Sequence, residues 1–120
     1  MTQRKRLKII ERCFEVSKDV RYVAVYIDNE LSMNAREDLK DASSSDSDKY
    51  EELLVNPTLI KLATQRGNID CGGLKFLIIR YGNFFQFVYP FENGHVSVAL
   101  ESTADVASLS RLLESTIDEN

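Results

Sequence analysis

Apolar and aromatic residues fill nearly every position of GLKFLIIRYGNFFQFVY, the segment from 73 to 89. A strand with one face in water alternates apolar and polar side chains, and this segment shows no clean alternation. Two tight turns divide the region, because Gly82–Asn83 and Asn93–Gly94 are both typical of β-hairpins. The pattern therefore predicts an antiparallel meander of three strands whose two faces are both covered.

The two turns also set the register of the meander. One predicted face consists of Phe76, Ile78, Phe87, Tyr89, Val98 and Leu100. The other consists of Leu77, Ile79, Val88 and Ala99. A two-residue turn makes Tyr81 and Phe84 a hydrogen-bonded pair, so the backbone N–H groups alternate in direction along the first strand. The N–H groups expected to point away from the meander are those of Phe76, Ile78 and Arg80.

Three elements are predicted before the meander. Residues 5–18 place apolar side chains along one wide side of a helix. The run RYVAVYI, residues 21–27, is apolar on both sides and predicts a strand that is buried on both faces. After a turn at 28–30, the more polar residues 31–36 predict an edge strand that pairs back.

A Ser/Asp-rich segment, DLKDASSSDSD at 38–48, follows this edge strand. It contains too little apolar surface to order itself, so we expect a flexible loop. Serines that precede acidic residues also fit a regulatory phosphorylation site, although a solvated linker is the simpler interpretation.

The residues after this loop carry helix start and stop signals. Asp48 followed by Glu51 resembles a capping box and predicts a short helix. Asn56 and Pro57 then predict the start of a second helix, because Asn is a good cap and Pro fits the first helical position. Gly67 predicts the end of that helix.

A last helix is predicted over 104–117, with Ser102 or Thr103 as its cap. The element order is then α-β-β-α-β-β-β-α. This order predicts a single α+β domain over residues 1–120, an α/β/α sandwich in which a five-stranded antiparallel sheet carries helices on both faces.

The charge balance bears on the class of partner. A net charge of -4 and a pI near 5.0 argue against nucleic acid as a partner. The one cationic cluster is interpreted as a solvated helix face, and it consists of Arg4, Lys5, Arg6 and Lys8. No apolar run approaches the roughly 20 residues of a membrane helix, so no membrane association is expected.

Few residues are candidates for catalysis or metal binding. The two cysteines, Cys13 and Cys71, occur without a secretory signal, which favours reduced thiols and a cytoplasmic location. His95 is the only histidine, so neither a metal site nor a base for Cys71 is expected, and the sequence has no phosphate-binding glycine pattern. We therefore expect no catalytic residues, no cofactor and no enzymatic activity.

Three segments stand out together: the N-terminal amphipathic helix, YVAVYID and LKFLIIRYGNFFQFVYPFENGHVSVALE. With these segments the chain resembles the Roadblock family of dynein light chains and bacterial GTPase-regulating proteins, which have a profilin-like fold. The element order matches over nearly the whole chain. The resemblance implies a dimeric interaction scaffold that binds and regulates a small GTPase or a larger assembly.

A second functional class is a small-molecule sensor of the PAS-like or profilin-like kind. Here an aromatic-rich sheet and helices would enclose a ligand cavity. PAS-type sensors usually carry several short helices between their second and third strands. This chain has one loop and one or two helices there, which favours the scaffold.

The first strand of the meander, residues 74–81, is expected at the edge of the sheet. Soluble proteins usually protect such edges with charges, bulges or proline, and this strand offers only Lys75 and Arg80. We therefore expect a homodimer in which two copies pair edge to edge about a two-fold axis. The predicted interface residues are Phe76, Leu77, Ile78, Ile79 and Arg80.

Overall fold

The structure is a computed structural model and describes residues 1–39 and 45–119. Its elements in chain order are α1 (Gln3–Val16), β1 (Val20–Ile27), β2 (Glu30–Ala35), the 3₁₀ helix η1 (Glu37–Leu39), α2 (Ser45–Tyr50), the π-helix η2 (Glu51–Val55), α3 (Asn56–Asp70), β3 (Leu77–Arg80), β4 (Phe84–Phe91), β5 (Gly94–Glu101) and α4 (Val106–Asp118).

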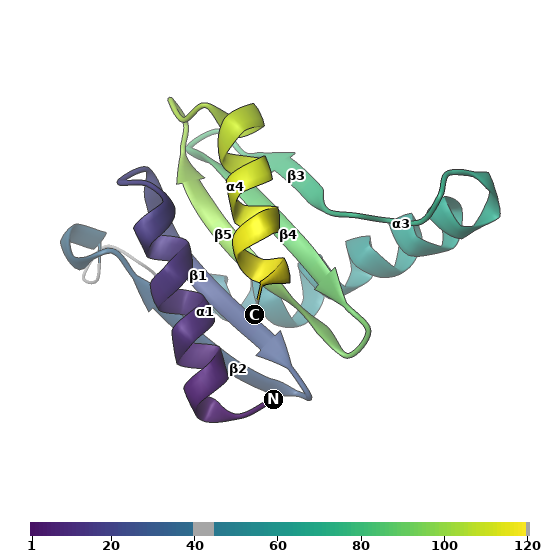
Figure 1. Ribbon diagram of the computed structural model, residues 1–120, viewed down its shortest axis with the longest axis horizontal. Helices are drawn as coiled ribbons and strands as arrows, with labels where there is room; N and C mark the ends of the chain where they lie inside the picture. Colours follow the sequence, from purple (N-terminus) through teal and green to yellow (C-terminus); the bar gives the residue numbers. More distant parts are fainter. Residues whose placement is uncertain (40–44, 120) are drawn as a thin grey trace.

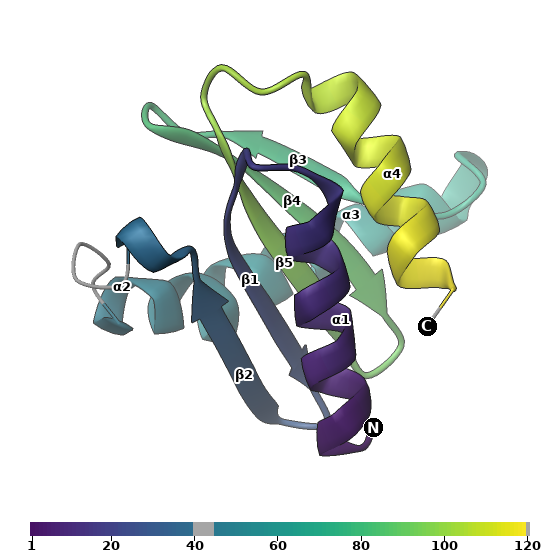
Figure 2. The same ribbon diagram turned by 60° about the vertical axis from the view of Figure 1, so that its left-hand side comes forward.

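The strands form one antiparallel sheet in the order β2-β1-β5-β4-β3. Helices α1 and α4 lie side by side on one face, and the helical segment from α2 to α3 runs behind the other face (Figure 1, Figure 2). The predicted fold class is therefore confirmed. β3 is an end strand, as the sequence predicted.

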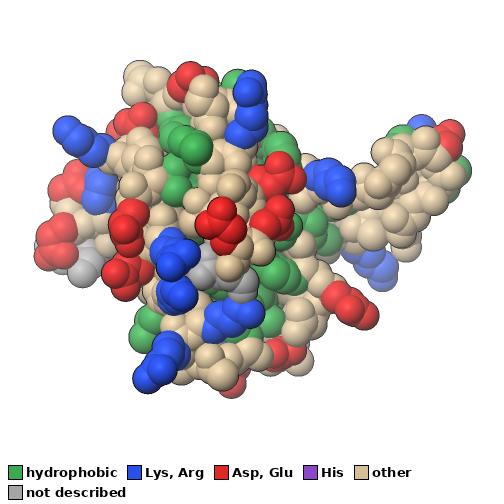
Figure 3. All heavy atoms as spheres, in the orientation of Figure 1, with side chains coloured by type: hydrophobic (Ala, Val, Ile, Leu, Met, Phe, Trp, Pro, Cys, Tyr) green, Lys and Arg blue, Asp and Glu red, His purple; other side chains and the backbone are tan. Residues whose placement is uncertain are grey.

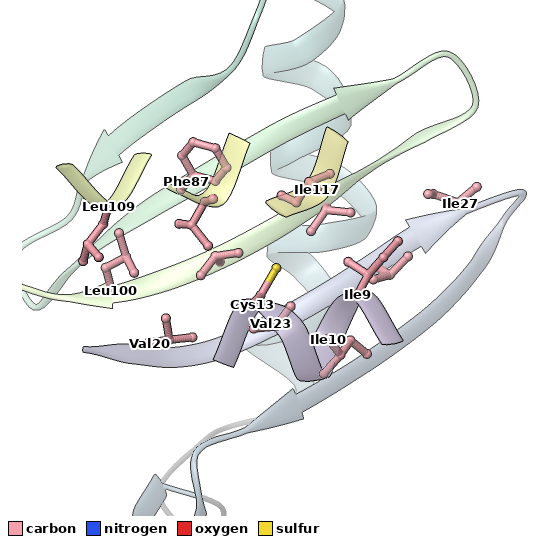
Figure 4. Close-up of a cluster of buried hydrophobic side chains, with 14 residues drawn as sticks. Ile9, Ile10, Cys13, Val20, Val23, Ile27, Phe87, Leu100, Leu109 and Ile117 are labelled. Carbon is pink, nitrogen blue, oxygen red and sulfur yellow. The ribbon is translucent and has the colours of Figure 1, made fainter. Parts of the chain in front are cut away.

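The main core lies between the sheet and the helices α1 and α4 (Figure 4). This core includes Ile9 and Cys13 of α1, Val23 of β1 and Phe87 of β4, and all four side chains are enclosed. Full burial of one such side chain stabilises the fold by about 1.5–3 kcal/mol. This face therefore carries most of the apolar packing.

The meander has the predicted faces, and its first hairpin has the predicted pairing. Ile78 pairs with Phe87, and Ile79 pairs with Gln86. The Tyr81 N–H donates to the Phe84 carbonyl at 2.9 Å, which fixes the alternation of N–H directions along β3. β3 itself has only 4 residues and is shorter than the predicted strand at 74–81. Its ladder with β4 begins at Leu77, where the chain arrives from the end of α3.

Pro57 explains why the middle helices differ from the prediction. The helix runs without a break from Ser45 to Asp70, so Asp48 and Asn56 lie inside it and neither marks a separate helix start. Proline cannot donate to the carbonyl four residues earlier, and its ring crowds that carbonyl. The helix accommodates Pro57 by widening into η2, where the Asn56 N–H donates to the carbonyl of Glu51, five residues earlier.

Gly67 does not end the helix, because α3 continues to Asp70. A glycine is needed there for another reason. The Gly73 N–H donates to the Gly67 carbonyl at 3.0 Å, and a Cβ on Gly67 would lie 3.1 Å from the carbonyl carbon of Gly73. Gly72 and Gly73 reverse the chain with φ values of 80° and 88°. The returning segment runs back to the sheet, and the far part of α3 projects beyond it (Figure 1, Figure 3).

Three smaller expectations also need correction. Of the predicted flexible loop at 38–48, residues 40–44 lie outside the described residues, and residues 45–48 are helical. The cap of α4 is Asp105, whose carboxylate accepts from the Ser108 N–H at 3.3 Å, in place of Ser102 or Thr103. The second hairpin turn is Glu92–Asn93, because Gly94 already belongs to β5.

Arg6 departs from the expected solvated basic face, because its side chain is fully buried under α1. Its guanidinium donates to the Glu30 carbonyl at 2.8 Å and to the Ile27 carbonyl. These carbonyls flank the tight turn at Asp28 and Asn29, which both have positive φ. Arg6 therefore fastens α1 to the β1–β2 hairpin.

Candidate interaction surface

The outer edge of β3 is one side of the candidate surface. Within the described ranges 1–39 and 45–119, no other strand pairs with it. The register directs the N–H groups of Ile78 and Arg80 to this edge, and 40% of the Ile78 side chain is exposed. The Arg80 guanidinium lies over the Phe85 ring, 4.9 Å from its centroid, so its charge sits on the sheet face.

The five predicted interface residues are neighbours in space as well as in sequence. Four belong to β3, and Phe76 directly precedes it. The Phe76 ring packs against Phe87 with centroids 5.1 Å apart, so Phe76 belongs partly to the core. Leu77 and Ile79 face the α3 side and are half-buried. Ile78 and Arg80 are thus the most accessible of the five.

Helix α3 adds exposed apolar residues close to this edge. It starts behind the sheet and extends past the β3 side (Figure 1). The exposed fractions of Leu62 and Ile69 are 59% and 75%, and Figure 3 shows this projection standing clear of the main body. In the preceding π-helix, Leu53 and Leu54 are also exposed. Large apolar side chains gathered on one projecting element are typical of contact surfaces.

A buried polar network holds the π-helix to the back of the sheet. Both oxygens of the fully buried Glu52 carboxylate are hydrogen-bonded. Oε1 accepts from Asn56 Nδ2 at 3.0 Å and lies 2.7 Å from His95 Nε2. Oε2 accepts from Ser97 Oγ at 2.6 Å and from Tyr22 Oη at 3.0 Å. Burial, reinforced by Glu52, raises the pKa of Tyr22, which keeps its hydroxyl a donor.

Sequence reasoning missed this network, although one signal for it exists. Gln86, His95 and Ser97 fall on the same face of β4 and β5, and Gln86 Nε2 donates to Ser97 Oγ at 2.6 Å. Polar side chains on a buried sheet face need partners. Their pattern could have indicated a buried polar group in the covering helix.

The structure keeps the candidate nucleophile and base apart. Cys71 is exposed at the end of α3, whereas His95 is buried in the sheet against Glu52. Cys13 is also enclosed, and burial raises the pKa of its thiol to about 12. No Cys–His pair is therefore formed.

Residues 1–39 and 45–119 contain no group of three or more His, Cys, Asp or Glu side chains that could hold a metal ion. In the same part of the chain, no helix has the length and apolar character needed to cross a membrane.

Comparisons with known proteins bear on the fold. No protein-family model and no curated protein matches this sequence. A Roadblock/LC7 domain from Streptomyces avermitilis superimposes with a TM-score of 0.67 at 13% identity, over 92% of both chains. Myxococcus xanthus MglB superimposes with a TM-score of 0.66 at 10% identity, over 99% of this chain and 91% of MglB. The fold is therefore Roadblock-like.

Proposed function

We propose that this protein is a non-enzymatic interaction scaffold or regulator that works as a homodimer in the cytoplasm. The observation that carries the proposal is the outer edge of β3, which is apolar and unpaired within the described residues. An exposed strand edge of this kind favours pairing with another strand. A second copy offers the same edge across a two-fold axis.

The proposed dimer interface consists of Phe76, Leu77, Ile78, Ile79 and Arg80 within the segment 74–81. In this arrangement the outward N–H groups of β3 are satisfied by carbonyls of the other copy. The exposed side chains of α3 add apolar area beside the paired strands.

The proposed protein partner is a small GTPase or a component of a larger assembly. Support comes from the resemblance of the sequence to Roadblock proteins and from the Roadblock-like fold. The proposal includes no nucleic acid, membrane, metal or cofactor. The apolar projection of α3 supplies a surface that such a partner could contact.

Two proline substitutions on adjacent residues test the dimer. Arg80→Pro deletes an outward donor and spares the ladder with β4, whereas Ile79→Pro deletes an inward donor. We expect Arg80→Pro to give a folded monomer and Ile79→Pro to give a misfolded protein. Sedimentation velocity and circular dichroism measure the two properties.

The matched control is Arg80→Ala, which removes the same side chain but keeps the backbone donor. We expect it to remain dimeric. A monomeric wild type, or an Arg80→Pro protein that dimerises as tightly as wild type, would contradict the edge pairing.

The partner is tested by affinity capture from native cytosol followed by mass spectrometry, with wild type and Arg80→Pro as parallel baits. We expect a GTPase or assembly component to be enriched by wild type and reduced with the monomeric variant. Equal enrichment by both baits would show that the dimer is not the binding unit.

A further inference from the structure

A cleft of about 630 Å³ lies between the α2–η2 segment and the back of the sheet. Its volume is in the range of sites that take small organic molecules. The wall on the sheet side includes Tyr22, Phe84, Gln86 and Ala99, and Tyr81 closes one end. The helical wall includes Glu51 and Val55.

The lining is aromatic on one side. Tyr81 and Phe84 flank the β3–β4 turn with ring centroids 5.3 Å apart. Tyr22 lies on the neighbouring part of the sheet, and its hydroxyl donates a hydrogen bond to Glu52. Aromatic faces attract cations as well as apolar groups.

Glu51 is the polar feature that distinguishes this cleft. One oxygen, Oε1, accepts from Tyr81 Oη at 2.7 Å. The other, Oε2, is buried and has no hydrogen-bond partner. A buried carboxylate oxygen without a donor is costly, and natural proteins rarely leave one so unless a ligand or ion supplies it. Burial also raises the pKa of Glu51, as expected for an unneutralised carboxyl group.

The neighbouring residue provides an internal comparison. Glu52 has both oxygens saturated by four side chains and binds the helix to the sheet. In a regular α-helix consecutive side chains project about 100° apart. The π-turn of η2 nevertheless brings both Glu51 and Glu52 against the cleft. Single π-turns of this kind frequently mark functional sites.

The charge of the lining favours a positive ligand. Among the described residues of the lining, the Glu51 carboxylate has no cationic partner, and the cation present is Arg21. Arg21 is itself bound to Glu101 Oε1 at 2.5 Å, which offsets its charge. A cation with N–H donors can satisfy Glu51 Oε2 and neutralise the cleft.

We propose that this cleft binds a small organic cation, an alkylammonium or guanidinium group on an apolar body. Oε2 is enclosed in the unliganded protein, so the half-buried Glu51 carboxylate turns toward the cleft to accept a hydrogen bond from the cationic nitrogen. Tyr81, Phe84 and Val55 cover the apolar body. This site goes beyond the scaffold role, because none of the five proposed interface residues lines the cleft, although Tyr81 directly follows them in the chain.

The experiment uses three probes of nearly equal shape: phenethylammonium, the neutral 2-phenylethanol and the anionic 3-phenylpropionate. Each is titrated into the full chain and followed by amide chemical shifts. We expect phenethylammonium to bind with a Kd of about 1 mM, which is reasonable for so small a ligand, and to shift the amides of Glu51, Tyr81 and Phe84. The alcohol and the acid should bind at least about tenfold more weakly.

Two variants and one control locate the site. Glu51→Gln keeps the shape but removes the charge, and should weaken phenethylammonium binding about tenfold or more. Ala35→Leu fills the cleft from the edge strand β2 and should block binding. Glu11→Gln changes an exposed carboxylate on α1, on the other face of the sheet, and should bind as wild type does.

Several outcomes would overturn the proposal. The alcohol binding as tightly as the amine would show an apolar cleft without cation selectivity. Retained binding in Glu51→Gln or in Ala35→Leu would place the cation elsewhere. No amide shifts up to about 10 mM phenethylammonium would mean that the cleft does not take this class of ligand.

Discussion

The two end strands of the sheet, β2 and β3, differ in how their outward backbone N–H groups are protected. On β2 the register points the N–H groups of Leu31, Met33 and Ala35 outward. The Ala35 N–H is already bonded to Asn34 Oδ1 at 3.1 Å. On β3 the outward N–H groups belong to Ile78 and Arg80, and the neighbouring side chains are mostly apolar.

The ends of the two strands differ as well. β2 leads into a charged cluster, in which Arg36 binds Asp38 at 2.7 Å and lies 3.7 Å from Glu101. Charged and polar groups of this kind protect an edge from further pairing. On β3 the Arg80 guanidinium packs on the Phe85 ring, so its charge does not protect the strand edge from pairing. Within the described residues, β2 thus has polar protection near its C-terminal end, whereas the outer edge of β3 is apolar and unpaired, which favours β3 as the edge of the proposed dimer.

The largest effect should come from breaking the support of the β2 hairpin. Arg6→Met removes the guanidinium donor from the buried Ile27 carbonyl and the part-buried Glu30 carbonyl, so we expect a loss of about 3 kcal/mol in the free energy of unfolding. Urea denaturation measures this loss. The matched control is Arg12→Met, an exposed arginine of the same helix, which should change the stability by less than about 0.5 kcal/mol. Equal effects of the two changes would show that the buried guanidinium does not support the hairpin.

The next effect concerns the β3 edge itself. Ile78→Lys places like charges close to the two-fold axis, and we expect the dimer Kd to rise at least about tenfold while circular dichroism stays unchanged. Asn34→Lys makes a comparable change on β2 and should leave the dimer intact. Dissociation by Asn34→Lys alone would assign the interface to β2.

A smaller effect is expected when β2 is made to resemble β3. Asn34→Val removes the acceptor that occupies the Ala35 N–H and adds an apolar side chain to the edge. The free energy of unfolding should change by less than about 0.5 kcal/mol, because Asn34 is exposed. Sedimentation at high concentration should now detect species larger than the dimer. A protein that stays strictly dimeric would mean that Asn34 is not what closes β2.

The strands and their register could be predicted because short turns constrain them. The turn at Gly82–Asn83 allows one hairpin geometry, and a slip of one residue would move every side chain to the opposite face. The pairing of Ile78 with Phe87 follows directly from counting. The position of β3 at the edge could also be anticipated, since it followed from the expected sheet order.

The helical region could not be predicted in the same way. Asn56 and Pro57 are typical of a helix start, and only the fold reveals that a π-turn lets the helix pass through them. Nothing in the local sequence distinguishes Glu51 from Glu52. Their different roles depend on the side chains opposite each carboxylate: Tyr22 of β1 and Ser97 of β5 bind Glu52, and Tyr81 beside the β3–β4 turn binds Glu51. Contacts between residues that are far apart in the sequence leave no local sequence pattern from which they could be predicted.

The most direct test of the edge pairing is amide hydrogen exchange measured over a series of protein concentrations. If two copies pair through β3, the protection of the Ile78 and Arg80 amides from exchange should rise with protein concentration. Their N–H groups become hydrogen-bonded only across the two-fold axis. Ile79 should be protected throughout, and Leu31 and Met33 on β2 should exchange quickly at every concentration. If Ile78 and Arg80 exchange as fast as Leu31 and Met33 when sedimentation shows a dimer, the copies do not pair through β3.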